Sequence, residues 1–238
     1  MVFRNGSLPP GMAWLHLLIV AVLSANPVDL AALEAVSGTV SVAGSFPRVK
    51  PLTVFKNRAF CGASLVNETL LIGAGGGLRN AVVLLRALGG KAAHTPGAAT
   101  LDNKNCAFSP HVQVATLGSE LLLKNSDPIL HAVHARLGNE TLFNVGLPKW
   151  RQVRKRLDRP GVMRINCDVL HAWMSAAIVV TDTAYFAVTD DSGQFTINGV
   201  DTGEYEMNVW HERLGSQSTR LAVAAGVPRS VAVYYSPN

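Results

Sequence analysis

The stretch "VMRINCDVLHAWMSAAIVVTD", residues 162–182, joins two predicted strands through a loop that carries three potential metal ligands. Its first part, 162–166, alternates apolar and polar residues, which is the pattern of a half-buried strand. The part from 175 is a nearly continuous apolar run and indicates a buried strand. Between them lie Cys167, His171 and Met174, within eight positions. The stretch therefore predicts a β-protein and raises the question of whether this loop binds a metal.

Short strands are also predicted in the rest of the chain. The runs 37–44, 80–88 and 111–125 are rich in β-forming residues and are bounded by Gly, Asn or Pro. Hydrophobic residues make up 48% of the sequence and charged residues 16%, which favours a packed core over disorder. The 21 Gly and 12 Pro supply turns. Together these features predict an all-β sandwich or barrel.

Residues 1–25 have the pattern of an export signal. They contain one basic residue, Arg4, no acid, and an apolar run from Met12 to Val22 that is too short to cross a bilayer comfortably. We therefore expect a periplasmic or otherwise exported protein with no membrane span in the mature chain, although the cleavage site is not defined. Loss of Arg4 changes the net charge from +5 to +4, since 5 − 1 = 4, and so mild a basicity does not indicate nucleic-acid binding.

Export makes the cysteine count informative, because disulfides persist outside the cytosol. The chain has three cysteines, so at least one is unpaired. Cys61 and Cys106 both lie in loop-like sequence, which suits a bridge between them. Cys167 is then the odd thiol, and metal binding is one way to protect a thiol in an oxidising compartment.

A mononuclear electron-transfer copper site uses a cysteine thiolate, two imidazoles and a weak thioether. Cys167, His171 and Met174 provide three of these groups. The second imidazole must come from elsewhere, and His131 follows a predicted strand and a Pro-containing bend in "LLLKNSDPILHAVHA", residues 121–135. His134 either replaces His131 or gives a supporting hydrogen bond. The other possibility is that these residues are ordinary core fillers, since Cys and Met are soft and apolar.

These motifs resemble those of the cupredoxins, especially plastocyanin-like proteins. "KN" at 124–125 leading to His131 is similar to the strand and loop that carry the family's first histidine, and 167–174 is similar to its C-terminal ligand loop. The resemblance spans 37–181 and implies a Greek-key cupredoxin-like β-sandwich or barrel with one copper. The loop reads C-x3-H-x2-M rather than the plastocyanin-like C-x2-H-x4-M. Its spacing is like the last part of the binuclear loop of cytochrome oxidase subunit II, but Met163 replaces the first cysteine there, which excludes a binuclear site.

Residues 183–238 are predicted to form a second small β-sandwich. The run "TDDSGQFTINGVDTGEYEMNV" resembles carboxypeptidase regulatory-like, transthyretin-like modules. The resemblance implies that Phe195 and Tyr205 point into the core. It also implies that three glycines serve turns: Gly193, Gly199 and Gly203.

The leading hypothesis is an exported mononuclear, type 1-like copper protein that carries single electrons, with His131, Cys167, His171 and Met174 as ligands. An enzyme is disfavoured, because four protein ligands leave no open position for a substrate and no peptidase motif is present. The alternatives are a metal-free β-sandwich module for adhesion or for carbohydrate or protein binding, and a copper chaperone or storage protein.

The basic stretch 149–159, "KWRQVRKRLDR", is either a solvated edge or a docking patch for a redox partner. His111 is expected to pack at the start of a strand, with a ligand role in another site as the alternative, and His211 is expected to be structural or interfacial. His94 lies in loop-like sequence and supports no hypothesis.

Overall fold

The structure is a computed structural model that describes residues 1–2, 33–47, 49–90 and 94–237. These ranges contain eighteen strands, one four-residue α-helix and one short 3-10 helix, which confirms the predicted all-β class. Apart from residues 1–2, the predicted export signal in 1–25 lies outside the described residues. Among the described residues, no helix has the length and apolar character that crossing a membrane requires.

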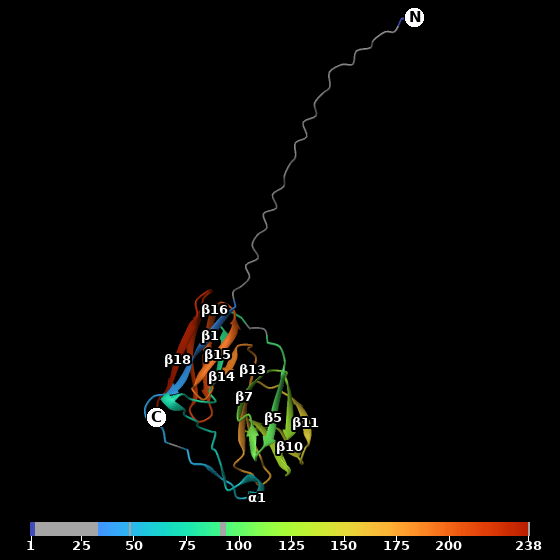
Figure 1. Cartoon of the computed structure of the whole chain (residues 1–238), viewed down its shortest axis with the longest axis vertical. Helices are drawn as coiled ribbons and strands as arrows, with labels where there is room; N and C mark the ends of the chain where they lie inside the picture. The colour runs from blue at the N-terminus through green and yellow to red at the C-terminus, as the bar shows by residue number, and fades with distance from the viewer. Residues whose placement is uncertain (3–32, 48, 91–93, 238) are drawn as a thin grey trace. The chain divides into compact units, whose positions relative to one another are not determined.

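The first sandwich packs a five-stranded sheet against a four-stranded sheet (Figure 1). The five-stranded sheet has the order β10 (Glu140–Leu147), β9 (His131–Leu137), β12 (Gly161–Asn166), β13 (Ser175–Thr181) and β7 (Val112–Thr116). The four-stranded sheet has the order β11 (Gln152–Arg156), β8 (Glu120–Asn125), β5 (Ala98–Lys104) and β6 (Ala107–Ser109). Leucines of β5 and β8 and isoleucines of β12 and β13 are buried in the core between the sheets. The strand order is non-consecutive, and β13–β7 and β5–β8 are parallel pairs.

The second sandwich contains strands from both ends of the sequence. One sheet has the order β15 (Gln194–Val200), β1 (Glu34–Val42) and β18 (Arg229–Tyr235). The other has the order β14 (Phe186–Val188), β4 (Val82–Ala87), β16 (Gly203–His211) and β17 (Gly215–Val223). In Figure 1 the blue β1 accordingly lies among orange and red strands.

The division expected from the sequence, 37–181 and 183–238, differs from this arrangement. β1 and β4 precede the first sandwich in sequence, yet each lies centrally in a sheet of the second sandwich. The reason is that periodicity shows that a segment is a strand but not which strand it pairs with. The features predicted within the second sandwich are present: Phe195 and Tyr205 are buried. The three turn glycines all have positive φ: Gly193, Gly199 and Gly203.

A third, smaller apolar cluster joins the two sandwiches through β13 and β4. Val179 of β13 faces this cluster whereas Ile178 faces the core of the first sandwich. β13 is therefore covered on both faces, which explains why its sequence is continuously apolar instead of alternating. At one side of the contact, the part-buried side chains of His111 and Glu212 share a hydrogen bond with 2.7 Å between Nε2 and Oε2.

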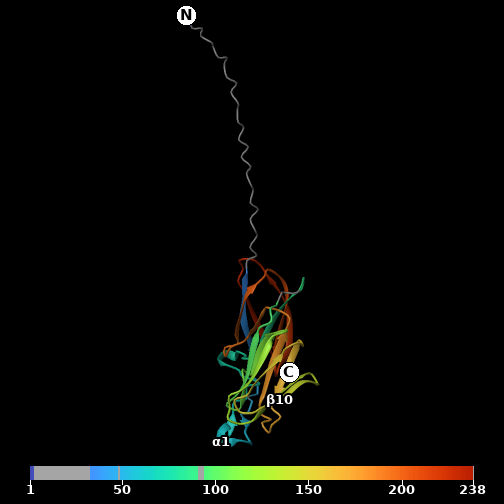
Figure 2. The same ribbon diagram turned by 90° about the vertical axis from the view of Figure 1, so that its right-hand side faces the viewer.

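A separate segment, which we call the cap segment, comprises residues 51–65 and contains β2 (Leu52–Thr53), α1 (Arg58–Cys61) and β3 (Ser64–Leu65). It leads towards the 3-10 helix η1 (Ala74–Gly76). The predicted disulfide between Cys61 and Cys106 is present and ties the cap segment to the first sandwich. In both Figure 1 and Figure 2, α1 lies at one end of the described strands.

Candidate metal centre

His131 is the first residue of β9, and the loop before it is fixed by side-chain hydrogen bonds. The Asn125 amide donates to the carbonyl oxygens of Ile129 and Leu147, both at 2.8 Å, and its Oδ1 accepts from the backbone N–H of Asp127 at 3.0 Å. These bonds satisfy polar backbone groups of the turn between β8 and β9. They hold the loop so that His131 enters β9 with its side chain directed into the core, where it is fully buried.

Cys167 and His171 come from the loop between β12 and β13. The Cys167 N–H donates to the Met174 carbonyl at 3.4 Å, and the Met174 N–H donates to the His171 carbonyl at 2.9 Å. These bonds close the loop, and Leu170 adopts a left-handed conformation with φ of 57°. Because β12 pairs with β9, the end of β12 lies beside the start of β9, and the loop reaches His131.

The three side chains converge on one point in the core. The two Nδ1 atoms of His131 and His171 are 3.1 Å apart, and Cys167 Sγ is 3.8 Å from His171 Nδ1. All three donor atoms lie within 4.8 Å of one another. The residues are buried, with exposed fractions of 0%, 2% and 3% for His131, His171 and Cys167.

The outer nitrogen of each imidazole already has a partner. His131 Nε2 lies 2.9 Å from the Asp127 carboxylate, and His171 Nε2 lies 3.5 Å from Asn57 Oδ1 in the cap segment. The Asp127 carboxylate can only accept, so His131 Nε2 carries the proton and His131 Nδ1 keeps its lone pair. Donation from His171 Nε2 to Asn57 Oδ1 leaves the lone pair of His171 on Nδ1 as well. Two lone pairs that face each other at 3.1 Å repel unless a proton or a cation lies between them.

Burial keeps the metal-free groups uncharged. Burial, and after it the neighbouring His131, lowers the pKa of His171 to about 4. Burial also lowers the pKa of His131, although Asp127 acts in the opposite direction. Burial raises the pKa of the Cys167 thiol, against the N–H groups of Ala132 and Val169 that donate to it. Near neutral pH both imidazoles are therefore neutral and free to coordinate, and a metal has to displace the thiol proton.

The donor set fits a first-row transition metal that accepts nitrogen and soft sulfur ligands. With bonds of about 2.0–2.1 Å to nitrogen and about 2.3 Å to sulfur, tetrahedral geometry separates two nitrogens by about 3.3 Å and nitrogen from sulfur by about 3.6 Å. The observed separations are 3.1 and 3.8 Å. The Ala132 N–H lies 3.3 Å from Sγ, a bond that supports a thiolate.

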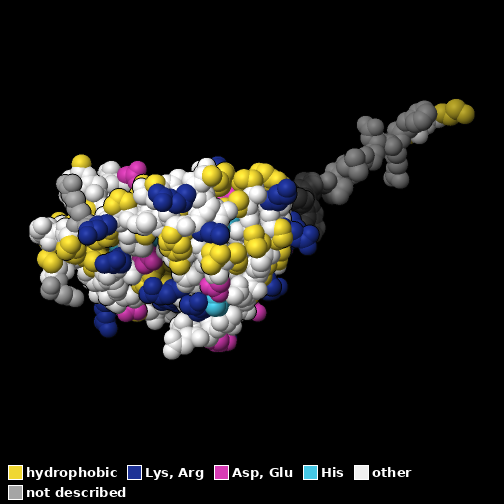
Figure 3. All heavy atoms as spheres, turned by 90° about the horizontal axis from the view of Figure 1, so that it is seen from below, with side chains coloured by type: hydrophobic (Ala, Val, Ile, Leu, Met, Phe, Trp, Pro, Cys, Tyr) yellow, Lys and Arg dark blue, Asp and Glu magenta, His cyan; other side chains and the backbone are white. Residues whose placement is uncertain are grey.

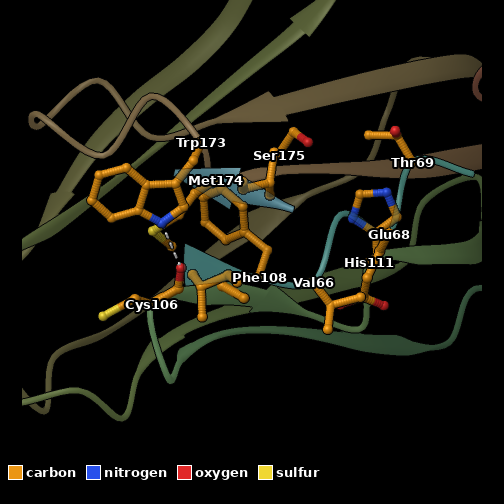
Figure 4. A pocket seen from close by; sticks show the side chains of 12 residues that line it. Val66, Glu68, Thr69, Cys106, Phe108, His111, Trp173, Met174 and Ser175 are labelled. Carbon is orange, nitrogen blue, oxygen red and sulfur yellow. Dashed lines mark hydrogen bonds between the residues drawn. The ribbon is translucent and has the colours of Figure 1, made fainter. Parts of the chain in front are cut away.

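Met174 is buried in the same apolar cluster as Cys167, with an exposed fraction of 1%. It also lines a small pocket of about 20 Å³ together with Trp173, Phe108 and His111 (Figure 4). None of the three converging residues lines that pocket. The predicted role of Met174 as the fourth ligand stays a prediction.

His134 does not join the three converging side chains. It lies three residues after His131 in β9, and an odd separation places two side chains on opposite faces of a strand. Its Nδ1 is 2.6 Å from Asp168 and its Nε2 is 2.9 Å from Thr141 on the outer face. The alternative in which His134 replaces His131 is therefore not supported by this geometry.

Among the described residues, three further histidines lie outside the cluster. His111 pairs with Glu212 between the sandwiches. His211 is buried and its Nδ1 accepts the Arg213 N–H at 3.2 Å. His94 is partly exposed and lies in a loop.

Three residues next to the cluster were not expected from the sequence: Asp127, Asn57 and Trp173. Asp127 had a local signal, since an Asx-type turn four residues before a histidine brings a carboxylate near the ring. Trp173 had a weaker signal, namely its position between His171 and Met174 in the same loop. Asn57 had none, because it is 114 residues from His171 in sequence.

Comparison with known proteins gives partial matches. The family described as polysaccharide lyase family 4, domain II, matches residues 169–230. This range includes β13 of the first sandwich and most of the C-terminal strands. This family is not the carboxypeptidase regulatory-like one, so the resemblance of 183–238 to carboxypeptidase regulatory-like modules remains a prediction. No curated protein matches the chain.

Solved structures that are similar to part of the chain include a cupredoxin, a nitrite reductase and an amicyanin. A purple cupredoxin from Nitrosopumilus maritimus is 20% identical, with 35% of this chain and 99% of that chain covered and a TM-score of 0.32. A copper-containing nitrite reductase from Thermus scotoductus SA-01 is 22% identical, with 41% and 25% covered and a TM-score of 0.32. A mutant amicyanin in its reduced state is 18% identical, with 42% and 98% covered and a TM-score of 0.32. Each likeness spans less than half of this chain.

Proposed function

We propose that this chain is an exported copper protein that carries single electrons. Its mononuclear site consists of His131, Cys167 and His171, with Met174 as the weak axial ligand, and holds one copper per chain. The observation that carries the proposal is the convergence of two imidazole Nδ1 atoms and one cysteine sulfur in the core, with both Nε2 atoms already paired.

The donor set suits one-electron chemistry at copper. A thiolate favours Cu(I) and imidazoles accept Cu(II), so one arrangement serves both oxidation states. The protein supplies rigidity: His131 is held by Asp127, Cys167 by the Ala132 N–H, and the loop by its own backbone bonds. A site held in this way has little to rearrange when the electron arrives, and its burial excludes water.

Two further observations support parts of this proposal. The Cys61–Cys106 disulfide suits an oxidising compartment, in agreement with an export signal in 1–25. Four protein ligands would leave no position for a substrate, which favours a carrier over an enzyme.

The basic stretch 149–159 is proposed as a docking patch for an acidic redox partner. Part of it is internally paired: Arg154 bonds to Glu120, and Arg159 makes two bonds to Glu140. Lys155 lies over the ring of Phe143, 5.5 Å from its centroid. Among the described residues, the cations of the stretch with neither an ion pair nor a ring contact are Lys149, Arg151 and Arg156. These three supply the attraction that steers an acidic partner.

Visible absorption and electron paramagnetic resonance after addition of Cu(II) and removal of excess metal test the proposal. We expect an intense thiolate-to-copper band and one copper per chain, and Cys167→Ser abolishes the band. His134→Asn is the matched control, because it removes an imidazole from the outer face of the same strand and leaves the band unchanged. A protein with reduced thiols that remains colourless and binds no copper would support a metal-free binding module instead. Tight Cu(I) binding with slow electron exchange would favour a chaperone or storage protein.

A further inference from the structure

His171, the candidate ligand that contacts the cap segment, is buried from solvent. Its exposed fraction is 2%, and its Nε2 faces Asn57 Oδ1 of the cap segment at 3.5 Å. The disulfide at Cys61 and the hydrogen bond between the Trp173 indole N–H and the Cys106 carbonyl, at 3.0 Å, hold the cap segment and the ligand loop together. A partner protein therefore meets the cap segment before it meets the imidazole.

A continuous series of ring contacts leads from the candidate metal centre through the cap segment to the surface. The ring centroids of His131 and His171 are 4.8 Å apart, and those of His171 and Trp173 are 5.0 Å apart. Phe55 of the cap segment packs edge-on against Trp173, with 5.1 Å between centroids. Trp173 is buried, whereas Phe55 has an exposed fraction of 62%. Phe55 is thus the solvent-facing end of the series.

The cap segment exposes both apolar and basic side chains. Exposed apolar side chains on the cap segment and on the two ligand loops include Phe60, Leu130 and Leu170. Lys56 and Arg58 flank Phe55 on the exposed side of the cap segment, and within the described residues neither has an ion-pair partner. Figure 3, which views the molecule from the end at which α1 lies, shows hydrophobic and Lys or Arg side chains interspersed, with fewer Asp and Glu.

We propose that the cap segment is the docking surface for an acidic electron-transfer protein, and that the electron passes through Phe55 and Trp173. This inference rests on the proposed function. The partner loses one electron and Cu(II) gains it, while no bond forms or breaks and no proton moves. The rings are the medium between the two centres and are not themselves oxidised.

The positive charge of the cap segment favours an acidic partner, and its exposed apolar side chains favour binding at the cap segment itself. Unpaired cations on the cap segment attract carboxylates and speed the encounter, an effect that salt screens. Exposed aromatic and aliphatic side chains at the centre then supply the desolvated contact that holds a complex.

The exposed Trp150 and the basic residues 149–151 follow β10, whose last residue Leu147 pairs with His131. The patch proposed above therefore begins at the same end of the molecule and extends the docking surface.

Reduced rubredoxin, a small acidic iron protein, is the probe, and reduced cytochrome c, a basic haem protein, is the comparison. With copper-loaded protein in stopped flow, we expect rubredoxin to react faster at low salt and cytochrome c slower. Reversing two charges with Lys56→Glu and Arg58→Glu should lower the rubredoxin rate constant about tenfold at low ionic strength. Unchanged rates with these substitutions would overturn the docking surface.

The route is tested by a matched pair of substitutions at saturating rubredoxin. Phe55→Leu keeps an apolar side chain and removes the ring that contacts Trp173. Phe60→Leu makes the same change on the same segment, at a ring for which the structure gives no contact with Trp173. We expect Phe55→Leu to slow electron transfer within the complex several-fold and Phe60→Leu to leave it unchanged. Equal rates for the two variants would overturn the route through Phe55.

Docking has a readout that does not need copper. Addition of oxidised rubredoxin to the metal-free protein should shift the amide resonances of residues 54–60, and the charge-reversed variant should lose these shifts. A protein that shows the shifts but no thiolate-to-copper band would fail the proposed function and keep the docking surface. A protein that shows the band but no shifts would keep the function and overturn the docking surface.

Discussion

Asp127 is the residue whose replacement tests the construction of the candidate metal centre most directly. Its buried carboxylate accepts three hydrogen bonds: Asn105 N–H at 2.7 Å on Oδ1, and Cys106 N–H at 2.8 Å and His131 Nε2 at 2.9 Å on Oδ2. In Asp127→Asn, one carboxylate oxygen becomes an NH2 group. Whichever way the amide turns, a donor then faces a donor.

The expected cost follows from these three bonds. A buried donor left without an acceptor costs about 1–3 kcal/mol, and the two remaining bonds weaken because a neutral oxygen accepts less strongly than a charged one. We therefore expect Asp127→Asn to lower the free energy of unfolding of the metal-free protein by about 2–4 kcal/mol. Loss of the carboxylate also leaves the His131 tautomer and ring orientation less firmly set, so copper affinity should fall by about 10–100-fold.

Urea unfolding and competition with a Cu(I) chelator measure the two effects. Asp102→Asn is the control, because Asp102 accepts from the N–H and hydroxyl groups of Ser126 in the same loop and contacts no imidazole. It should lower stability without changing copper affinity. If Asp127→Asn and Asp102→Asn have the same copper affinity, Asp127 does not orient a ligand and the reasoning fails.

Three further predictions concern the scaffold. Replacing Cys61 and Cys106 by Ala opens a link between positions 45 residues apart, and should cost about 4 kcal/mol of stability by urea unfolding. Burial lowers the pKa of His211 from 6.5 to about 4. The unfolded chain therefore binds a proton between these pH values that the folded protein does not, and about 3 kcal/mol of stability present above pH 6.5 is lost as the pH falls towards 4. His211→Asn should flatten this dependence, and an unchanged slope would contradict it. A fragment of residues 183–238 should remain unfolded because it lacks β1 and β4, and a dispersed amide spectrum would show otherwise.

The sequence predicted several of the strands and the loop that carries Cys167 and His171, because both depend on local patterns. Cys167 and His171 share one loop, and their spacing fixes their proximity once the loop closes. His131 needed only the expectation that its loop meets a neighbouring strand, which the β9–β12 pairing provides. The sequence could also have shown that His131 and His134 do not both face the core, since two residues three apart on a strand point to opposite faces. It was missed because the strand that begins at His131 was not recognised.

The remaining features depend on pairings between distant segments, which no local pattern reports. β1 pairs in parallel with β18, although Val36 and its partner Arg229 are far apart in sequence. The contact between Asn57 and His171 exists only because a disulfide and two short strands position the cap segment.

The arrangement of the second sandwich gives a physical reason for its association with the candidate metal centre. The chain leaves this sandwich after β1, forms the cap segment, and returns to it at β4. Both ends of the cap-bearing stretch are therefore central strands of a folded domain, while Cys61 attaches its middle to the first sandwich. A loop restrained at its ends and in its middle loses little further entropy when it covers His171. The second sandwich thus helps to hold Asn57 and Phe55 in place, and loosening it, for example by removing β1, should expose His171 even if the first sandwich stays folded.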